Sequence, residues 1–252
     1  MKRHVISVLS RLNLLRPVER LTRPLRRPLR RRHLRQFYGQ FVRSGDLCFD
    51  VGANLGNRTE AFLSLGARVV VVEPQRACLQ HLRQAFEKRP GVVIVPAAAA
   101  AEVGTAELAI ADETTETATL SERWRTEGRW NVFHYARTEA VPTTTLDALI
   151  AEHGVPAFVK IDVEGFEEQV LAGLSRPLPA LSFEFAAEFV DQTERCLARL
   201  ERLGHPRFNL SLADPLRLLS PAWLTAAEVR TMLRQVVAAD PAACGDVYAR
   251  AD

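Results

Sequence analysis

A short apolar run that leads into a glycine-rich bend constrains the fold of this chain most. In residues 46–57, Gly52 and Gly56 bracket a bend between an apolar strand pattern and a helical pattern that starts near Thr59. Glycine permits positive φ and leaves the backbone uncovered, and the first turn of a helix has N–H groups without a partner inside the helix. The stretch therefore predicts a strand, a tight turn and a helix start that can hold a small ligand.

A second apolar run, residues 69–72, ends at Glu73. An acid at this place in a βαβ unit commonly binds the hydroxyls of a ribose. The first turn reads GxxxG rather than GxGxxG, and Asp50 occupies the strand tip where a dinucleotide enzyme leaves room for pyrophosphate. We therefore expect a nucleoside cofactor with a cationic amino-acid end and no phosphates, which describes S-adenosylmethionine. A purely structural glycine turn is the alternative.

Apolar runs and helical patterns alternate along the rest of the chain. Strands are expected at 47–51, 68–72, 92–96, 157–164, 180–185, 208–212 and 247–249, with a short extra strand at 106–110, and helices at 55–65, 75–88, 166–174, 187–203 and 225–237. This order predicts an α/β fold with a doubly wound, mostly parallel sheet. The four cysteines are far apart in the sequence, so neither a disulfide framework nor a cysteine metal cluster is expected.

Charge is divided unevenly along the chain. Residues 1–43 carry 13 Lys and Arg against one acid, whereas the remainder carries 20 against 29. We predict a basic arm at 1–36, amphipathic and then broken by prolines, before a domain at 37–252. The arm is interpreted as a flexible or packed extension, as a binder of anionic membrane surfaces, or as a targeting segment. Nucleic acid is not favoured as its partner, because no aromatic residues alternate with the basic ones.

Residues 112–141 interrupt the alternation of strands and helices. The segment is first rich in Thr and Glu, and then brings Trp124, Trp130 and His134 close together in the sequence. A segment of this length between sheet elements commonly has a function, so we predict a lid over a second substrate, with a small satellite core as the alternative. His134 is a reserve candidate for a general base.

Charged residues alternate with apolar ones in residues 157–165. Lys160, Asp162 and Glu164 fall on one side of the predicted strand. Three charges on a central strand are costly if they are only structural, and ligands of parallel sheets bind at the carboxyl ends of the strands. The pattern therefore favours a site over a solvated strand end or an ion pair. No metal is expected, since two carboxylates without further ligands make a poor cation site.

Several motifs together resemble the FkbM family of S-adenosylmethionine-dependent methyltransferases. They are FDVGANLGN (49–57), VVVVEP (69–74), TTLDAL (144–149), VKIDVEGFEEQVLAGL (159–174) and GDVYAR (245–250). The resemblance covers roughly residues 37–250. It implies a Rossmann-like class I methyltransferase sheet of seven strands with the last strand antiparallel. It also implies O-methylation of hydroxyls on polyketide, sugar or lipid-linked acceptors, and it makes 37–252 a methyltransferase domain.

The resemblance also implies roles for individual positions. Asp50, Gly52, Ala53, Asn54 and Gly56 would form the cofactor loop, Thr59 would be the small hydroxyl residue after it, Glu73 would hold the ribose, and Lys160, Asp162 and Glu164 would line the reaction crevice. Two places depart from the family pattern. Asn57-Arg58 stands where an aromatic residue or histidine is commoner, and residues 96–100 lack the polar residue that commonly follows the third strand.

Methyl transfer from a sulfonium needs an aligned acceptor and benefits from a base that removes the hydroxyl proton. Our hypothesis is that Asp162 orients the amino end of the cofactor or the acceptor, while Glu164 or Lys160 assists deprotonation; Lys160 is alternatively an ion-pair partner. A different nucleoside-binding function, such as an NAD-dependent oxidoreductase or a binding module, is the second hypothesis. We expect a cytoplasmic protein, or one attached to the inner face of the membrane through its arm.

Overall fold

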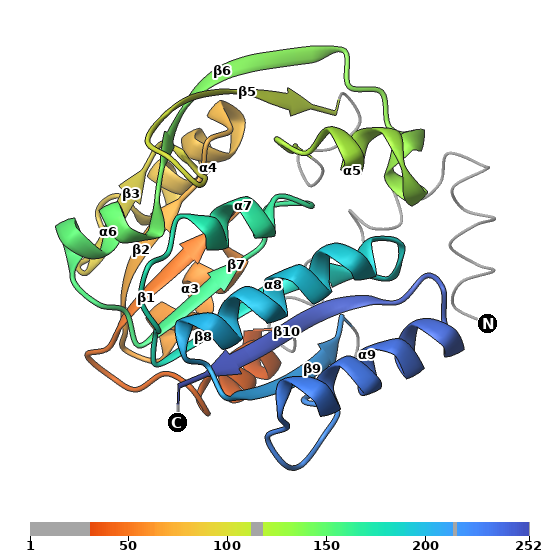
Figure 1. The fold of residues 1–252 in the computed structure, drawn as a ribbon. Helices are drawn as coiled ribbons and strands as arrows, with labels where there is room; N and C mark the ends of the chain where they lie inside the picture. The colour runs from red at the N-terminus through yellow and green to blue at the C-terminus, as the bar shows by residue number, and fades with distance from the viewer. Residues whose placement is uncertain (1–30, 112–117, 214–215, 252) are drawn as a thin grey trace.

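A seven-stranded sheet forms the centre of the computed structural model, which describes residues 31–111, 118–213 and 216–251. The strands lie in the order β3-β2-β1-β7-β8-β10-β9 (Figure 1). They are β1 Leu47–Val51, β2 Arg68–Val72, β3 Val92–Val95, β7 Phe158–Ile161, β8 Ala180–Ala186, β9 Arg207–Leu212 and β10 Cys244–Arg250. β10 runs antiparallel to both its neighbours and the other pairs are parallel, as predicted.

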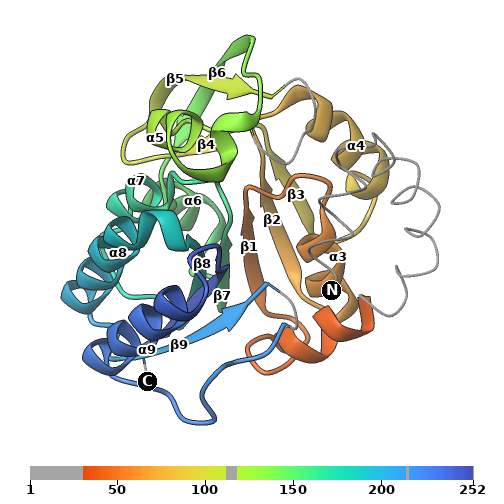
Figure 2. The ribbon, with the colours of Figure 1, turned by 90° about the vertical axis from the view of Figure 1, so that its right-hand side faces the viewer.

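Helices cover both faces of the sheet (Figure 2). One layer contains α3 Asn57–Ser64, α4 Arg76–Phe86 and a helical segment at 31–38; the other contains α6 Leu146–His153, α7 Glu167–Ala172, α8 Val190–Leu203 and α9 Ala226–Ala239. Alternate residues of β2 belong to two separate apolar clusters: Val69 and Val71 to one, and Val70 and Val72 to the other. Burial on both faces explains why the central strands read as continuous apolar runs.

The helical segment at 31–38 crosses the predicted boundary between arm and domain. Leu34 is 5% exposed and packs in the same apolar cluster as Phe37 and Tyr38. The body of the domain therefore includes Leu34. The rest of the predicted arm, residues 1–30, lies outside the described residues. Among those that are described, no helix is long and apolar enough to span a bilayer.

A second, three-stranded sheet lies beyond the main one. β5 (Gly104–Ile110) contains the predicted extra strand and pairs antiparallel with β6 (Arg137–Thr144), which pairs in turn with β4 (Ala98–Ala99). The end of the predicted lid, from Arg137, is thus strand rather than loop, because it is paired along its length with β5. A side-chain cap begins α6 where it follows β6: the Thr145 hydroxyl accepts a hydrogen bond from the N–H of Ala148 at 3.0 Å.

β7 is shorter than the predicted strand. It ends at Ile161, so that Asp162 and Glu164 lie in the loop between β7 and α7. The φ angles of Glu164 (54°) and Gly165 (88°) are both positive, which is incompatible with an extended strand. Only Lys160 of the three predicted charges is therefore a strand residue.

Candidate active site

A cavity of about 930 Å³ opens at the carboxyl ends of β1, β2, β7 and β8. Eight of the ten predicted site residues line it: Asp50, Gly52, Ala53, Asn54, Gly56, Glu73, Asp162 and Glu164. The other two, Thr59 and Lys160, are fully buried behind the wall. The tips of the first two strands thus present Asp50 and Glu73 to one common space, where ligands of open α/β sheets bind.

Both glycines of the turn have positive φ, 76° at Gly52 and 78° at Gly56. A Cβ at Gly52 would lie 1.8 Å from the backbone oxygen of Asp162, and one at Gly56 would lie 2.4 Å from Cε2 of Phe86. The sequence had suggested that the bare backbone faces a ligand. The structure gives a further reason for the absence of side chains at these two positions. Without a Cβ, the β1 turn can touch the β7 loop and α3 can approach α4.

Asp50 is held from behind by the first turn of α3. The Thr59 hydroxyl donates a hydrogen bond of 2.5 Å to Oδ2 of Asp50, and Asp50 is 2% exposed. Burial raises the pKa of the Asp50 carboxyl, and the Thr59 hydrogen bond and the positive charge of Arg58 oppose that rise. Thr59 therefore acts on the cavity indirectly, by orienting the carboxylate that lines it.

Glu73 is fixed by two backbone donors. Its Oε2 accepts from the N–H of Asn54 at 2.7 Å and its Oε1 from the N–H of Gln75 at 2.8 Å. Burial raises the pKa of Glu73 to about 7, with the two N–H donors opposing the rise. The carboxyl is thereby locked against the cavity, and each oxygen keeps a lone pair for a ligand hydroxyl.

Lys160 forms a buried ion-pair network. Its Nζ lies 3.1 Å from Oδ2 of Asp162 and 2.9 Å from Oδ1 of Asp246 in β10, and it donates to the backbone oxygen of Ile161 at 3.0 Å. Burial alone lowers the pKa of Lys160, but the two carboxylates outweigh it and hold the pKa above its ordinary value. The geometry is that of the ion-pair alternative, with the ammonium buried behind the cavity wall between the two carboxylates.

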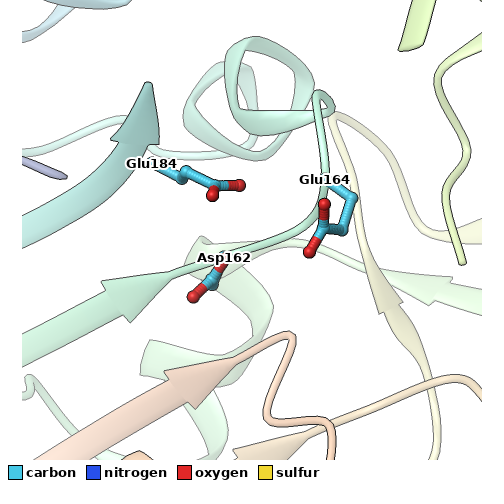
Figure 3. A group of neighbouring side chains, drawn as sticks. All are labelled: Asp162, Glu164 and Glu184. Carbon is cyan, nitrogen blue, oxygen red and sulfur yellow. The ribbon is translucent and has the colours of Figure 1, made fainter. Parts of the chain in front are cut away.

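Glu184 joins Asp162 and Glu164 in a group of three carboxylates (Figure 3). Each offers an oxygen within 4.8 Å of the others, and Glu184 also lines the cavity. Its strand, β8, brings it beside the β7 loop and opposite Asp246. Sequence reasoning placed Glu184 at the end of a strand without giving it a role, although Asp50 and Glu73 close their apolar runs in the same way.

Arg58 is a second cavity residue that sequence reasoning left without a role. It lines the cavity from the first turn of α3, with Nε buried and without a hydrogen-bond partner. Its charge acts on Asp50 and Asp162. The departure from the family pattern at Asn57-Arg58 thus places a cation where an aromatic residue or histidine is commoner.

Residues 118–133 pack over the loop that carries Glu164. The Thr119 hydroxyl donates to the backbone oxygen of Glu164 at 2.6 Å, and a Cβ at Gly165 would lie 2.4 Å from Cε3 of Trp124. The Trp124 ring stacks on those of Trp130 and Phe189, with centroids 3.8 and 5.2 Å away. The aromatic residues thus form a satellite core beside the cavity, while Thr119 and its neighbours form part of the wall.

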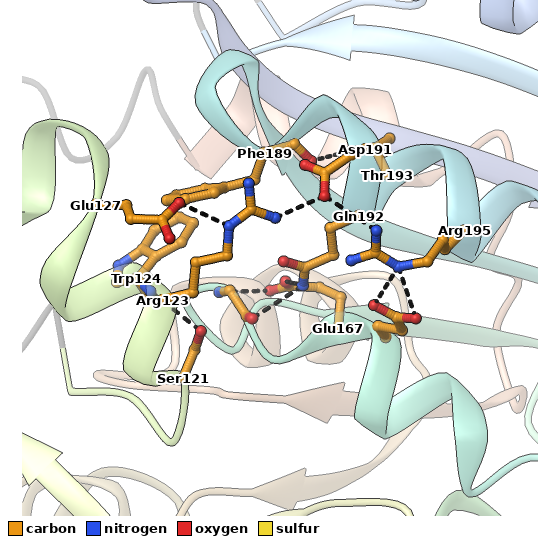
Figure 4. A network of polar contacts seen from close by, with 12 residues as sticks. Ser121, Arg123, Trp124, Glu127, Glu167, Phe189, Asp191, Gln192, Thr193 and Arg195 are labelled. Atoms are coloured by element: carbon orange, nitrogen blue, oxygen red, sulfur yellow. Dashed lines mark hydrogen bonds and ion pairs between the residues drawn. The ribbon is translucent and has the colours of Figure 1, made fainter.

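Ion pairs connect this segment to the start of α8 and to the residues just before it, and Figure 4 shows the pair between Arg123 and Asp191. Arg123 in α5 (Glu122–Thr126) pairs with Asp191 at 2.7 Å, and Arg129 pairs with Glu188 at 2.6 Å. The predicted lid residues 112–117 lie outside the described residues. His134, the reserve base, is exposed and does not line the cavity.

The far end of the cavity is apolar. Ala97, Ala98, Ala99 and Leu108 form its wall there. Within the part of this wall that the structure describes, small apolar side chains occupy the region that follows β3, in agreement with the missing polar residue noted in the sequence. A flat aromatic ring such as adenine fits such a wall through packing rather than through side-chain hydrogen bonds.

The sheet order, the antiparallel β10 and a cavity at the carboxyl ends of β1 and β2 define the class I methyltransferase fold. A model of the methyltransferase FkbM domain matches residues 50–206. The chain belongs to the FkbM methyltransferase family. It is therefore an S-adenosylmethionine-dependent methyltransferase, which confirms the expected cofactor and rules out the oxidoreductase alternative.

Solved structures with similar architecture share little sequence with this chain. Precorrin-6Y C5,15-methyltransferase from Geobacter metallireducens is 12% identical with a TM-score of 0.45, and the match covers 90% of this chain and 87% of that one. Fibrillarin from Aeropyrum pernix, solved with bound S-adenosyl-L-methionine, is 13% identical with a TM-score of 0.39, over 83% and 68% of the two chains. No curated protein matches the chain.

Proposed function

We propose that this methyltransferase acts on a hydroxyl group, of a sugar, a lipid-linked glycan or a polyketide-type acceptor. The observation that carries the proposal is the cluster of Asp162, Glu164 and Glu184 on the cavity wall. Carboxylates accept hydrogen bonds from hydroxyls and repel phosphates and carboxylates. Such a wall suits an uncharged, hydroxyl-rich acceptor better than an anionic one.

Other residues that line the same cavity fit the cofactor. Glu73 would hold the ribose hydroxyls, the loop from Gly52 to Gly56 would face the amino-acid end, and Asp50 or Asp162 would bind its ammonium group. When bound there, S-adenosylmethionine supplies a methyl group on a positively charged sulfur that is already an activated leaving group. The protein's own contribution is to align the acceptor oxygen, to exclude water and to receive the hydroxyl proton.

The proposal is tested with labelled cofactor and a cellular extract of glycans and polar lipids. We expect the label to enter a glycan or lipid fraction and to resist mild alkali, because a methyl ether is stable under conditions that hydrolyse a methyl ester. Label that appears only in protein or nucleic acid, or that alkali releases, would contradict O-methylation of a hydroxyl.

A further inference from the structure

We propose that Glu184 is the catalytic residue that takes the proton from the acceptor hydroxyl. The inference rests on the proposed O-methylation and adds the identity of the base. In the reaction, the acceptor oxygen forms a bond to the methyl carbon as the bond from that carbon to sulfur breaks. The bonding pair goes to sulfur, which leaves a neutral thioether, and the hydroxyl proton goes to the Glu184 carboxylate. That proton then passes to solvent when product leaves.

The position of Glu184 is suited to this step. It lies near the end of β8 on the cavity wall, one residue beyond the last residue that pairs with β7 and opposite Asp246 in β10. Its side chain is partly exposed on that wall, although Oε2 itself is buried. A catalytic base needs an oxygen that is free to meet the incoming hydroxyl, and a side chain held by a strand is placed more reproducibly than one held by a loop.

Lys160 and Asp162 are poorer bases at the same place. The Lys160 ammonium is fully buried between Asp162 and Asp246 and stays protonated, so it has no lone pair to offer. Burial raises the pKa of Asp162, but Lys160 and Arg58 outweigh it and hold the pKa below its ordinary value. Asp162 therefore remains ionised and is a weak base, suited to orienting a cation or a hydroxyl.

Glu184 has the opposite environment. The groups that face it are Lys160, Asp162 and Glu164 from β7 and its loop, Glu167 from α7, and Asp246 from β10. Burial, together with the negative charges of Asp162, Glu164 and Glu167, raises the pKa of Glu184 well above its ordinary value. When their surroundings give two neighbouring carboxyls different pKa values, the two commonly have different roles. One stabilises charge and the other accepts the proton.

The short spacing of the carboxylates is also explained without a metal ion. Like charges at such distances need a cation or a shared proton. Lys160 already supplies the cation at 3.1 Å from Asp162, and the raised pKa of Glu184 favours a proton on that carboxyl. The absence of a metal remains a prediction from the sequence, and a chelator tests it.

The experiment compares the full-length protein with Glu184→Gln, Glu184→Asp and a control, Glu87→Gln, whose side chain is exposed at the end of α4. Initial rates are measured with tritiated cofactor and the glycan and polar-lipid fraction that the wild type labels, from pH 5.5 to 9. Calorimetric titration with S-adenosylhomocysteine reports whether each variant still binds cofactor product.

We expect kcat/KM of the wild type and of Glu87→Gln to rise with pH as Glu184 loses its proton. For Glu184→Gln, kcat/KM should no longer rise with pH and should be lower than that of the wild type by about 100-fold or more. This variant should still bind S-adenosylhomocysteine nearly as the wild type does. Glu184→Asp keeps a carboxylate, so its lower rate should still rise with pH. Addition of EDTA, followed by excess MgCl₂, should leave all rates unchanged.

Three outcomes overturn the proposal while leaving O-methylation intact. They are a Glu184→Gln variant within threefold of the wild type, the same loss of pH dependence in Glu164→Gln but not in Glu184→Gln, and activity that EDTA abolishes and MgCl₂ restores. If Glu184→Gln does not fold, an unchanged rate in Glu184→Asp is the contradicting result. A wild type that binds S-adenosylhomocysteine but labels no glycan or lipid fraction contradicts the proposed function itself, and the inference with it.

Discussion

Individual buried carboxyls in this protein affect both ligand binding and stability, and they make both depend on pH. Glu73 and Glu167 are both nearly inaccessible, and burial raises the pKa of each to about 7. Each accepts two backbone N–H groups: Glu73 from Asn54 and Gln75, and Glu167 from Val163 and Gly165. Replacing either carboxyl therefore changes a charge, a loop conformation and a proton-binding site together.

Replacement of Glu73 by Gln should weaken cofactor binding. The amide keeps one acceptor oxygen and puts an NH₂ group where a backbone N–H and a ribose hydroxyl need an acceptor. A buried donor left facing a donor costs about 1–3 kcal/mol, which corresponds to roughly a 5- to 150-fold loss of affinity for S-adenosylhomocysteine by calorimetry. Unchanged affinity would remove Glu73 from the cofactor site. The exposed Glu87→Gln variant is the control.

Glu167 should make the stability of the protein depend on pH. The folded state binds a proton at Glu167 up to about pH 7, whereas the unfolded chain releases it near its ordinary pKa, so folding is favoured at low pH and this contribution is lost as pH rises through 7. Glu167→Gln still offers an oxygen to Val163 and Gly165 but cannot titrate. As pH falls from 7.5 to 5, the free energy of unfolding of the wild type, measured with urea, should increase by about 2 kcal/mol relative to that of this variant. A constant difference over that interval would contradict the assignment.

At the scale of secondary-structure elements, the site depends on close contacts between turns. The β1 turn touches the β7 loop through Gly52, and the β7 loop touches Trp124 through Gly165. Residues 118–133, the β7 loop and α8 are thereby packed together beside the cavity, with Arg123 pairing to Asp191 of α8 and Arg129 to Glu188 just before it. We therefore expect a substitution in one of these turns to shift the positions of Asp162 and Glu164.

Two glycines allow this contact to be measured against a matched control. Gly52 and Gly45 both have positive φ, 76° and 89°, but a Cβ at Gly45 would meet nothing within 4 Å, whereas one at Gly52 would lie 1.8 Å from the oxygen of Asp162. Gly45→Ala should cost about 1 kcal/mol of unfolding free energy, and Gly52→Ala several kcal/mol. Equal losses in chemical denaturation would show that the β1 turn does not press on the β7 loop.

The stability of residues 118–133 should depend on their aromatic stack more than on their ion pairs. Trp124 is 3% exposed, whereas Arg123 and Asp191 are both partly exposed. Truncating a buried tryptophan costs about 3–5 kcal/mol, and an exposed ion pair contributes less than about 1 kcal/mol. Trp124→Ala should therefore lower stability and methyl transfer far more than Arg123→Ala does. Comparable effects of the two changes would contradict this ranking.

For the whole molecule, the sequence predicted the sheet and the residues at the ends of β1 and β2 well because those features are local. The strands are short apolar runs, and Asp50 and Glu73 close two of them next to a glycine turn or a proline. The relation of Lys160 to Asp246 could not be predicted, since it depends on strand order and on an antiparallel β10 far along the chain. Glu184 was missed for the same reason: only the pairing of β8 with β7 brings it to Asp162.

The predicted basic arm remains to be tested at this scale. If the arm attaches the protein to membranes, the full-length protein should sediment with vesicles that contain anionic lipids, and increasing salt should release it. A version that lacks residues 1–30 keeps Leu34, which is part of the apolar core, and should stay in the supernatant. Equal sedimentation of both forms would rule out attachment through the arm.

The most direct test of the account is a crystal structure of the protein with S-adenosylhomocysteine. We predict that the ribose hydroxyls lie within hydrogen-bond distance of Glu73, that the adenine lies against the wall formed by Ala97, Ala98 and Leu108, and that the sulfur points toward Asp162 and Glu184. A ligand bound outside this cavity, or bound in it without contact to Glu73, would contradict the account.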